Sequence, residues 1–228
     1  MVADEDALRA VTAGDEGLLA GLGDGALLVE MSTVGPAAVR RLAERVPRFA
    51  SLLDAPVLGS VSEAAAGSLR IFVGGDDEDV ERARPVLEAL GTPIHVGPLG
   101  SGAAAKLVAN STLFGVLGVL GEAIALGEGR GLSRDVVFDV LAVTPVAAQA
   151  ERRRPALESR SYPRRFSLAL ARKDADLIAA AAAERSLDLR LAEAARSWLL
   201  DADQAGWGDL DYSAVLARIV GEARPGPD

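Results

Sequence analysis

The sequence contains no cysteine, which excludes disulfide bonds, thiolate catalysis and metal sites with cysteine ligands. Its single histidine, His95, cannot form a histidine cluster, so we expect no metal site; between Ile94 and Val96 it reads as a locally hydrogen-bonded strand residue. Cationic residues are outnumbered, and the formal net charge of −9 argues against a nucleic-acid partner or an anionic membrane surface.

Targeting and membrane-spanning segments are not visible in the sequence. No basic region precedes an apolar stretch near the N-terminus, so no signal peptide is recognised. The longest apolar run, LFGVLGVLGEAIAL, is interrupted by Glu122, and we expect it to be too short to span a bilayer. Half of the 228 residues are hydrophobic, which predicts a folded core in a cytoplasmic protein.

Lysine and asparagine are almost absent, and their positions are therefore informative. The only lysines are Lys106 and Lys173, and the only asparagine is Asn110. Lys106 and Asn110 stand four residues apart, on one face of a predicted helix. Lys106 either extends its ammonium group to solvent or lies in a cleft, where partial desolvation lowers its pKa and suits it to proton transfer. Helical spacing alone leaves both interpretations open.

The pattern of apolar residues divides the chain after residue 98. Residues 1–98 alternate short apolar runs with amphipathic stretches, which predicts a mainly parallel α/β sheet. Residues 99–228 contain no strand candidate and predict an all-α domain. The expected strands are 26–31, 50–59, 68–75 and 92–97, and the expected helices are 36–46, 76–90, 100–129, 133–142, 145–157, 167–185, 188–203 and 211–221. The predicted fold class is α/β followed by all-α.

Several segments, taken together and in order, resemble the β-hydroxyacid dehydrogenase family, which includes 3-hydroxyisobutyrate dehydrogenase and the glyoxylate/succinic semialdehyde reductases. The segments are VEMSTVGP (29–36), DAPVLGSVSEAAAGSLRIFVGG (54–75), GPLGSGAAAKLVAN (97–110), FSLALARKDADL (166–177) and GWGDLDYSAV (206–215). The third resembles the helix that carries the family's catalytic lysine. The resemblance extends over nearly the whole chain.

This resemblance implies an NAD(P)-dependent oxidoreductase with an incomplete Rossmann-type domain and a helical dimerisation domain. Lys106 would be the general acid and base, with Asn110 beside it. Arginine could not replace this lysine, because it stays charged and cannot transfer the proton. The implied substrate-binding residues are Gly59, Ser60, Val61, Phe166 and Lys173, and the implied cofactor-binding residues are Ser32, Thr33, Lys173 and Asp174. The implied partners are a small carboxylate-bearing substrate and a second copy of the chain.

The sequence also departs from the family pattern. Glu30 stands where aspartate is usual, and Leu58-Gly59-Ser60 replaces a Ser-Gly-Gly run, so the identity of the substrate stays open. Ser-Thr before a helix is, by itself, typical of a helix N-cap.

No G-x-G-x-x-G loop follows a strand, since GLLAGLGDG (17–25) ends a helix instead. We therefore expect about three strands of the family's first domain and the choice between NAD and NADP to lie outside this chain. An inactive shortened oxidoreductase is one hypothesis. The alternatives are a cofactor-less binding or dimerisation protein on the same scaffold, and an imine reductase, a group that usually lacks the lysine.

Overall fold

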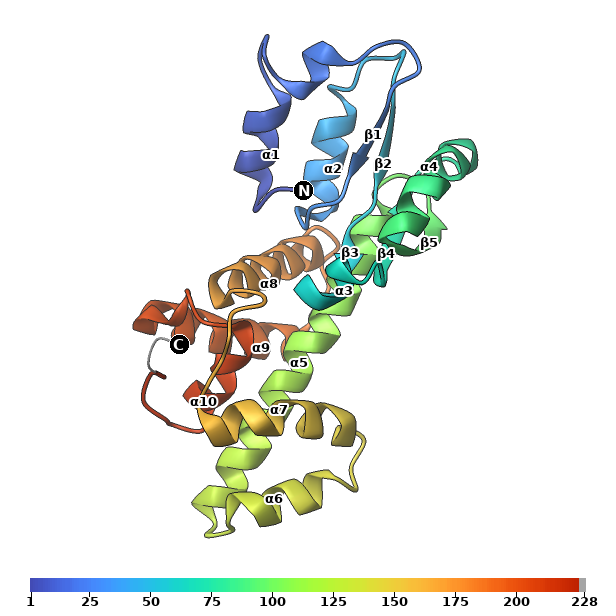
Figure 1. The fold of residues 1–228 in the computed structure, drawn as a ribbon. Helices are drawn as coiled ribbons and strands as arrows, with labels where there is room; N and C mark the ends of the chain where they lie inside the picture. Colours follow the sequence, from blue (N-terminus) through green and yellow to red (C-terminus); the bar gives the residue numbers. More distant parts are fainter. Residues whose placement is uncertain (226–228) are drawn as a thin grey trace. The chain divides into compact units, whose positions relative to one another are not determined.

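The computed structural model describes residues 1–225 and divides the chain into two compact units, 1–109 and 110–228 (Figure 1). The long helix α5, Ser101–Gly129, continues through this division. The domain boundary that the sequence suggests, after residue 98, stays a prediction. The fold class, α/β followed by all-α, is confirmed.

The first unit alternates helices with the strands of one five-stranded sheet. Its elements are α1 Glu5–Thr12, β1 Leu27–Glu30, α2 Gly35–Ala43, β2 Ser51–Asp54, β3 Val57–Leu58, α3 Val61–Ala65, β4 Leu69–Gly74, α4 Asp77–Leu90 and β5 Gly91–Gly97. The order of strands is β1-β2-β4-β3, and β5 pairs with β4. As the sequence predicts, Pro36 lies in the first turn of α2, where its missing N–H has no helical acceptor.

The sheet is mixed rather than mainly parallel. β1 pairs with β2 and β4 with β5 in parallel, whereas β4 pairs with β2 and β3 in the antiparallel sense. The strand expected over 50–59 is broken at Ala55-Pro56, because proline has no N–H to donate to a ladder. Only a short helix and its flanking loops join β3 to β4, and such a short connection favours antiparallel pairing.

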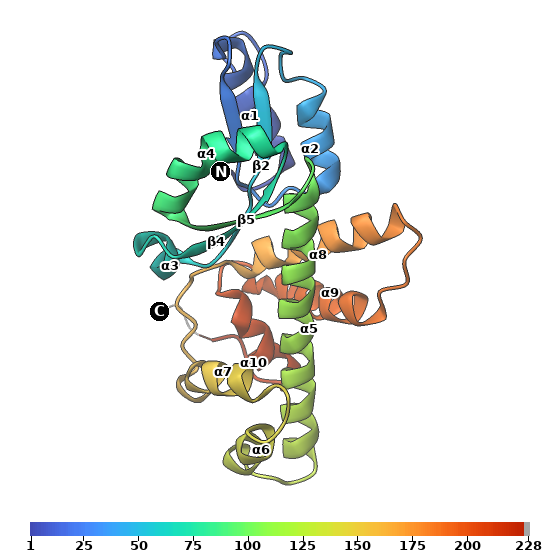
Figure 2. The ribbon, with the colours of Figure 1, turned by 90° about the vertical axis from the view of Figure 1, so that its right-hand side faces the viewer.

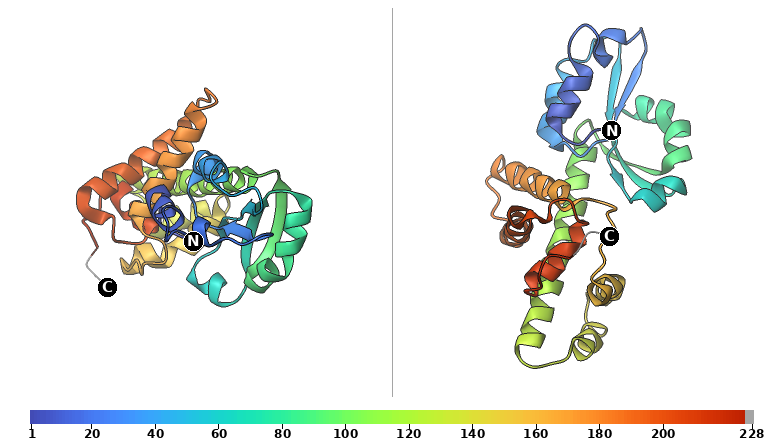
Figure 3. Two further views of the ribbon diagram at one scale, coloured as in Figure 1. Left: turned by 90° about the horizontal axis from the view of Figure 1, so that it is seen from above. Right: turned by 60° about the vertical axis from the view of Figure 1, so that its left-hand side comes forward.

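Helices cover both faces of this sheet (Figure 3). The helices α1 and α2 pack on one face through Leu8, Val39 and Leu42, while α4 packs on the other through Val80 and Leu87. The central strands β2 and β4 are therefore largely buried, which explains their apolar residues, whereas β5 is mostly exposed. β1 ends in Glu30 and β2 in Asp54, two buried polar residues that concern the site.

Among the residues that the structure describes, the second unit consists of helices joined by loops, with one isolated β-bridge between Ser167 and Asp211. After the remainder of α5 come α6 Arg134–Leu141, α7 Ala147–Ser159, α8 Leu168–Ala183, α9 Arg190–Ala202, the π-helix η2 Asp203–Trp207, the 3₁₀-helix η3 Tyr212–Ala214 and α10 Val215–Ile219. The helices α8 and α9 form a hairpin and lie side by side (Figure 2). Gly121 lets α5 approach α10 closely, since a Cβ there would lie 2.7 Å from Ile219 Cδ1.

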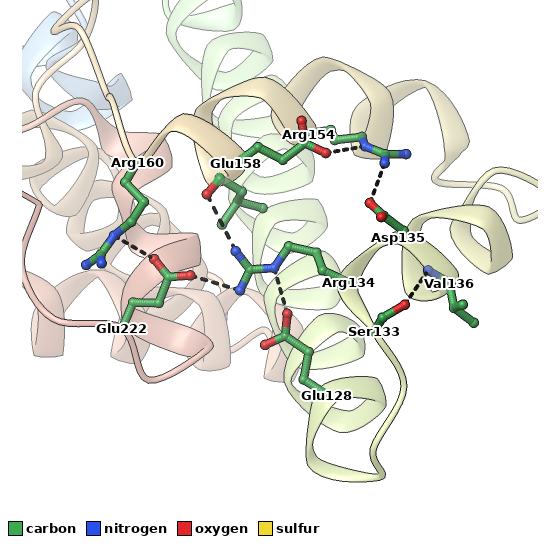
Figure 4. Close-up of polar contacts among 10 residues, drawn as sticks. Glu128, Ser133, Arg134, Asp135, Val136, Arg154, Glu158, Arg160 and Glu222 are labelled. Carbon is green, nitrogen blue, oxygen red and sulfur yellow. Dashed lines mark hydrogen bonds and ion pairs between the residues drawn. The ribbon is translucent and has the colours of Figure 1, made fainter.

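Ion pairs join the far end of α5 to α6, α7 and the C-terminal segment (Figure 4). The Arg134 guanidinium lies 2.6 Å from Glu128 Oε1 and 2.8 Å from Glu222 Oε1, and Arg160 reaches the second oxygen of Glu222 at 3.4 Å. Arg154 pairs with Asp135 at 2.8 Å. We interpret these ion pairs as a structural network that connects the helices of the second unit.

The helix α5 is long and apolar enough to cross a membrane, so the expectation that its apolar run is too short is wrong on length. A core helix of a soluble protein also has this character, and 39% of its most apolar stretch is buried within the protein. Glu122, within the run, accepts a hydrogen bond from Trp198 Nε1 at 2.8 Å. On α5, Leu117 and Ile124 are buried while Val108 and Leu126 are exposed, so the helix is apolar on more than one face.

Candidate active site

The second unit brings Asn110, Lys173 and Asp174 together. Asn110 lies on α5 and the other two on α8, 64 residues away in the sequence. Asn110 Nδ2 donates a hydrogen bond to Asp174 Oδ2 at 2.8 Å, and Lys173 Nζ lies 2.8 Å from Asp174 Oδ1. Asn110 is 1% exposed and Asp174 is 2% exposed. The two carboxylate oxygens therefore bind different partners, one neutral and one cationic.

In this arrangement Asn110 acts on Lys173 through Asp174. Its amide group supports Asp174, which in turn binds Lys173 and keeps this ammonium in one place. A buried carboxylate needs such donors because removing its charge from water without them costs on the order of several kcal/mol. The Lys173 side chain is 21% exposed, so it can still contact a ligand.

In the first unit, Lys106 lies in the second turn of α5, which begins at Ser101, and is half-buried. The helix is continuous through Lys106 and Asn110, which confirms their spacing of one turn. The carboxylate of Asp54, at the end of β2, accepts the amides of Gly100 at 2.7 Å and Ala103 at 2.6 Å. Burial raises the pKa of Asp54, and the hydrogen bonds from Ala103 and Gly100 oppose that rise.

Ser32 and Thr33 follow β1, as expected, but Ser32 is not a helix N-cap. Its hydroxyl oxygen accepts the amide of Val2 at 2.8 Å, and the N-cap of α2 is Val34. Ser32 is 3% exposed and Thr33 is half-buried. The neighbouring Glu30 is buried and accepts the Ser32 amide at 2.7 Å; its desolvation raises its pKa.

Gly59 and Ser60 lie between β3 and α3, and Val61 is the first residue of α3; Gly59 and Val61 are exposed. The Ser60 amide donates to Glu63 Oε2 at 2.8 Å. The backbone amide of Ser60, an implied substrate-binding residue, thus donates to a carboxylate of the chain itself. Sequence reasoning noted Glu63 only through the family block, although Ser-x-x-Glu is the signature of a capping box.

Phe166 precedes α8, and its ring packs on Tyr212 with ring centroids 5.4 Å apart. Asp211 holds this turn, because its Oδ2 accepts the amides of Arg165 at 3.1 Å and Phe166 at 3.2 Å. The last two sequence blocks, which contain these residues, therefore meet in space. Asp211 is a further residue that sequence reasoning did not single out.

His95 has the local role expected of it. Its Nε2 lies 2.9 Å from the carbonyl oxygen of Gly75 and 3.0 Å from that of Gly97. Of the candidate residues, one set lies in the second unit (Asn110, Phe166, Lys173 and Asp174) and the other in the first (Ser32, Thr33, Gly59, Ser60, Val61 and Lys106).

Both halves of the chain match known families. Residues 1–100 match the NAD-binding domain of 6-phosphogluconate dehydrogenase, and residues 100–219 match the NAD-binding family of NADP-dependent 3-hydroxyisobutyrate dehydrogenase.

Individual proteins extend these matches. The NAD-dependent L-serine dehydrogenase of Pseudomonas aeruginosa is 45% identical over 130 residues, which cover 56% of this chain and 43% of that enzyme. Glyoxylate/succinic semialdehyde reductase 1 of Arabidopsis thaliana is 29% identical, with coverage of 96% and 77%. The structure of Mycobacterium tuberculosis 3-hydroxyisobutyrate dehydrogenase with L-serine superposes with a TM-score of 0.84 at 31% identity, again covering 96% and 77%. The chain thus spans less than half of the first protein's length and about three quarters of the other two.

Proposed function

Because this chain belongs to the β-hydroxyacid dehydrogenase family, with its nicotinamide cofactor, we propose that it serves hydride transfer between that cofactor and a small hydroxy acid or its aldehyde or keto acid. The main support is the placement of the chain's rare residues. The buried Asn110 and Asp174 form one set of contacts with the partly exposed Lys173, and Lys106 lies one turn before Asn110 on α5.

The cofactor, when bound, supplies a hydride to the carbonyl carbon of the substrate. Lys106 donates a proton from its ammonium group to the carbonyl oxygen as the carbon–oxygen π bond opens. In the reverse direction the neutral amine accepts the hydroxyl proton. Lys173, fixed by Asp174, provides a positive charge for the substrate carboxylate or the cofactor. Gly59, Ser60, Val61 and Phe166 complete the proposed substrate contacts.

The residues fit a nicotinamide cofactor better at its reactive end than at its pyrophosphate. Lys173 and Thr33 retain exposed surface, whereas Ser32 is buried beneath Val2. No G-x-G-x-x-G loop occurs in the sequence, and the N-terminus of α5 is occupied by Asp54. We therefore propose that these 228 residues by themselves bind NADH and NADPH weakly and turn over slowly. NAD and NADP are both compatible with the proposal.

A cofactor-less binding or dimerisation protein on the same scaffold is the second candidate. The preserved Lys106, Asn110 and Lys173 favour the enzyme, since a scaffold does not require them. Lys106 also counts against an imine reductase. We also propose that the protein is cytoplasmic. We further propose a homodimer, because α5 exposes Val108, Val119 and Leu126 outside its buried face. Light scattering that finds a stable monomer at micromolar concentration contradicts the dimer.

The test compares two proteins, the chain itself and a fusion that adds before Met1 about three strands with their helices, the first strand being followed by a glycine-rich loop. Calorimetric titration with NADH and NADPH should give sub-millimolar binding only to the fusion. The fusion should reduce glyoxylate or succinic semialdehyde, or oxidise L-serine or 3-hydroxyisobutyrate. A fusion that binds cofactor and turns over none of these acids contradicts the enzyme and supports the binding protein. Sub-millimolar binding by the chain itself contradicts the account of the missing loop.

A further inference from the structure

Asp54 is buried at the end of β2 and contacts the first turn of α5. It has no solvent exposure, and its two carboxylate oxygens each accept one backbone amide, those of Gly100 and Ala103. The first amides of a helix have no acceptor within the helix, and the helix dipole makes this end positive. A carboxylate that binds two of these amides therefore fixes both the position and the direction of the helix start.

Close backbone packing reinforces this contact. A Cβ at Gly102 would lie 2.4 Å from the carbonyl oxygen of Phe72 and 2.5 Å from that of Asp54, so α5 begins directly against the sheet. Gly74 leaves the same space from the other side, where a Cβ would lie 2.3 Å from Asp54 Oδ1. The first turn of α5 thus has little freedom to shift relative to β2 and β4.

Lys106 is three residues beyond Ala103 on the same helix, about 4.5 Å along its axis at 1.5 Å per residue. A change in how the first turn is seated must therefore change where the Lys106 side chain begins. We propose that Asp54 is a positioning residue for Lys106, fixing the start of α5 and thereby the place of the ammonium group; this rests on the acid–base role proposed for Lys106. Asp54 itself does not touch the reacting atoms.

Asp54→Asn is the sharpest variant, because the shape of the side chain is kept while one of its two acceptors becomes a donor that faces a backbone amide. Gly102→Ala perturbs the same contact without changing a charge. Gly115→Ala is the matched control, since it makes the same substitution in the same helix where a Cβ meets nothing within 4 Å. If Asp54→Asn fails to fold, Gly102→Ala carries the test.

The chain has only two lysines, so isotope-labelled lysine gives two assignable side-chain NMR signals, with Lys173 as the internal reference. We expect Asp54→Asn and Gly102→Ala to shift or broaden the Lys106 signal and leave Lys173 unchanged. Gly115→Ala should change neither. In the cofactor-binding fusion, the first two variants should lower kcat by about tenfold to a hundredfold with a small change in KM, since misplacing a catalytic group by 1 Å has that scale.

A folded Asp54→Asn protein whose Lys106 signal and kcat match the parent overturns the proposal. Equal changes at Lys106 and Lys173 also overturn it, because they indicate general loosening rather than positioning. If the parent fusion has no activity, the proposed function fails, while the NMR comparison still decides whether Asp54 positions Lys106.

Discussion

Two buried aspartates, Asp54 in the first unit and Asp174 in the second, are compensated by different means. In the first unit, Asp54 binds backbone amides at the start of α5. In the second, Asp174 binds the side chains of Asn110 and Lys173. Each unit also contains one of the two lysines. Backbone partners make Asp54 a support for a helix, whereas side-chain partners make Asp174 a support for a cation. One aspartate therefore positions Lys106 indirectly, through the helix, whereas the other positions Lys173 by direct contact.

The largest expected effect separates the two lysines by chemistry. Lys106→Ala in the cofactor-binding fusion should reduce kcat by at least ~10²-fold, the scale of losing a general acid. Lys106→Arg should be nearly as impaired, since arginine cannot release the proton near neutral pH. Steady-state turnover at saturating substrate measures both. An arginine variant with near-normal kcat would contradict proton transfer by Lys106.

Lys173 should behave in the opposite way. Lys173→Met should raise KM for acid substrates by about tenfold to a hundredfold, since hydrogen bonds to charged groups contribute about 1.5–3 kcal/mol, and change kcat less. Lys173→Arg keeps the charge beside Asp174 and should restore most of the affinity. Uncharged aldehydes are the control substrates. If their KM rises equally with Lys173→Met, the lysine does not bind the carboxylate.

Asn110 tests the side-chain pairing of the second unit. Asn110→Ala removes one donor from the buried Asp174 and should lower the free energy of unfolding by about 1–3 kcal/mol. Asn110→Asp should cost more, because it places a second carboxylate against the first. Denaturant unfolding measures both effects. Val108→Ala, which truncates a 67% exposed residue on the same helix, should change stability little. An equal loss with that control would mean that the effect is common to side-chain truncation on this helix and is not due to the lost contact with Asp174.

Glu30 tests the first unit through pH. One of its carboxylate oxygens is buried without a hydrogen-bond partner, and burial raises its pKa above the ordinary value of 4.5. The folded state therefore binds this proton more strongly, so stability falls as pH rises from about 4.5 through the raised pKa. The free energy of unfolding of Glu30→Gln should depend on pH less steeply than that of the parent. At pH 7 it should exceed the parent's value by about 1 kcal/mol for each unit by which burial raises the pKa of Glu30. Exposed Glu16→Gln should reproduce neither change.

The smallest effect concerns Glu63, which is only half-buried. Glu63→Gln weakens the competition for the Ser60 amide and should lower KM for acid substrates by about threefold, in keeping with partly exposed charged contacts. An unchanged KM would place the substrate carboxylate away from Ser60.

Local patterns predicted most of the elements to within a few residues. Pro36 and the acidic start of α4 are chemical signals that need no tertiary contact. The break at Pro56 and the antiparallel pairings depend on how distant strands meet, which alternation does not encode. Asn110 was marked as unusual by its rarity, but its partner is 64 residues away, and nothing local identifies Asp174 as the acceptor. The role of Asp54 could not be predicted for the same reason, since the amides that it accepts belong to Gly100 and Ala103, 46 and 49 residues away in the sequence.

The composition of α5 has a consequence for when the site takes shape during folding. This helix of 29 residues contains six glycines, and each costs about 1 kcal/mol relative to alanine in a helix interior. Such a segment is a poor helix in isolation and forms only as its neighbours pack against it. The turn that carries Lys106 and Asn110 is thus a late product of folding, and its amides should exchange with deuterium only in the rare openings that unfold the whole domain.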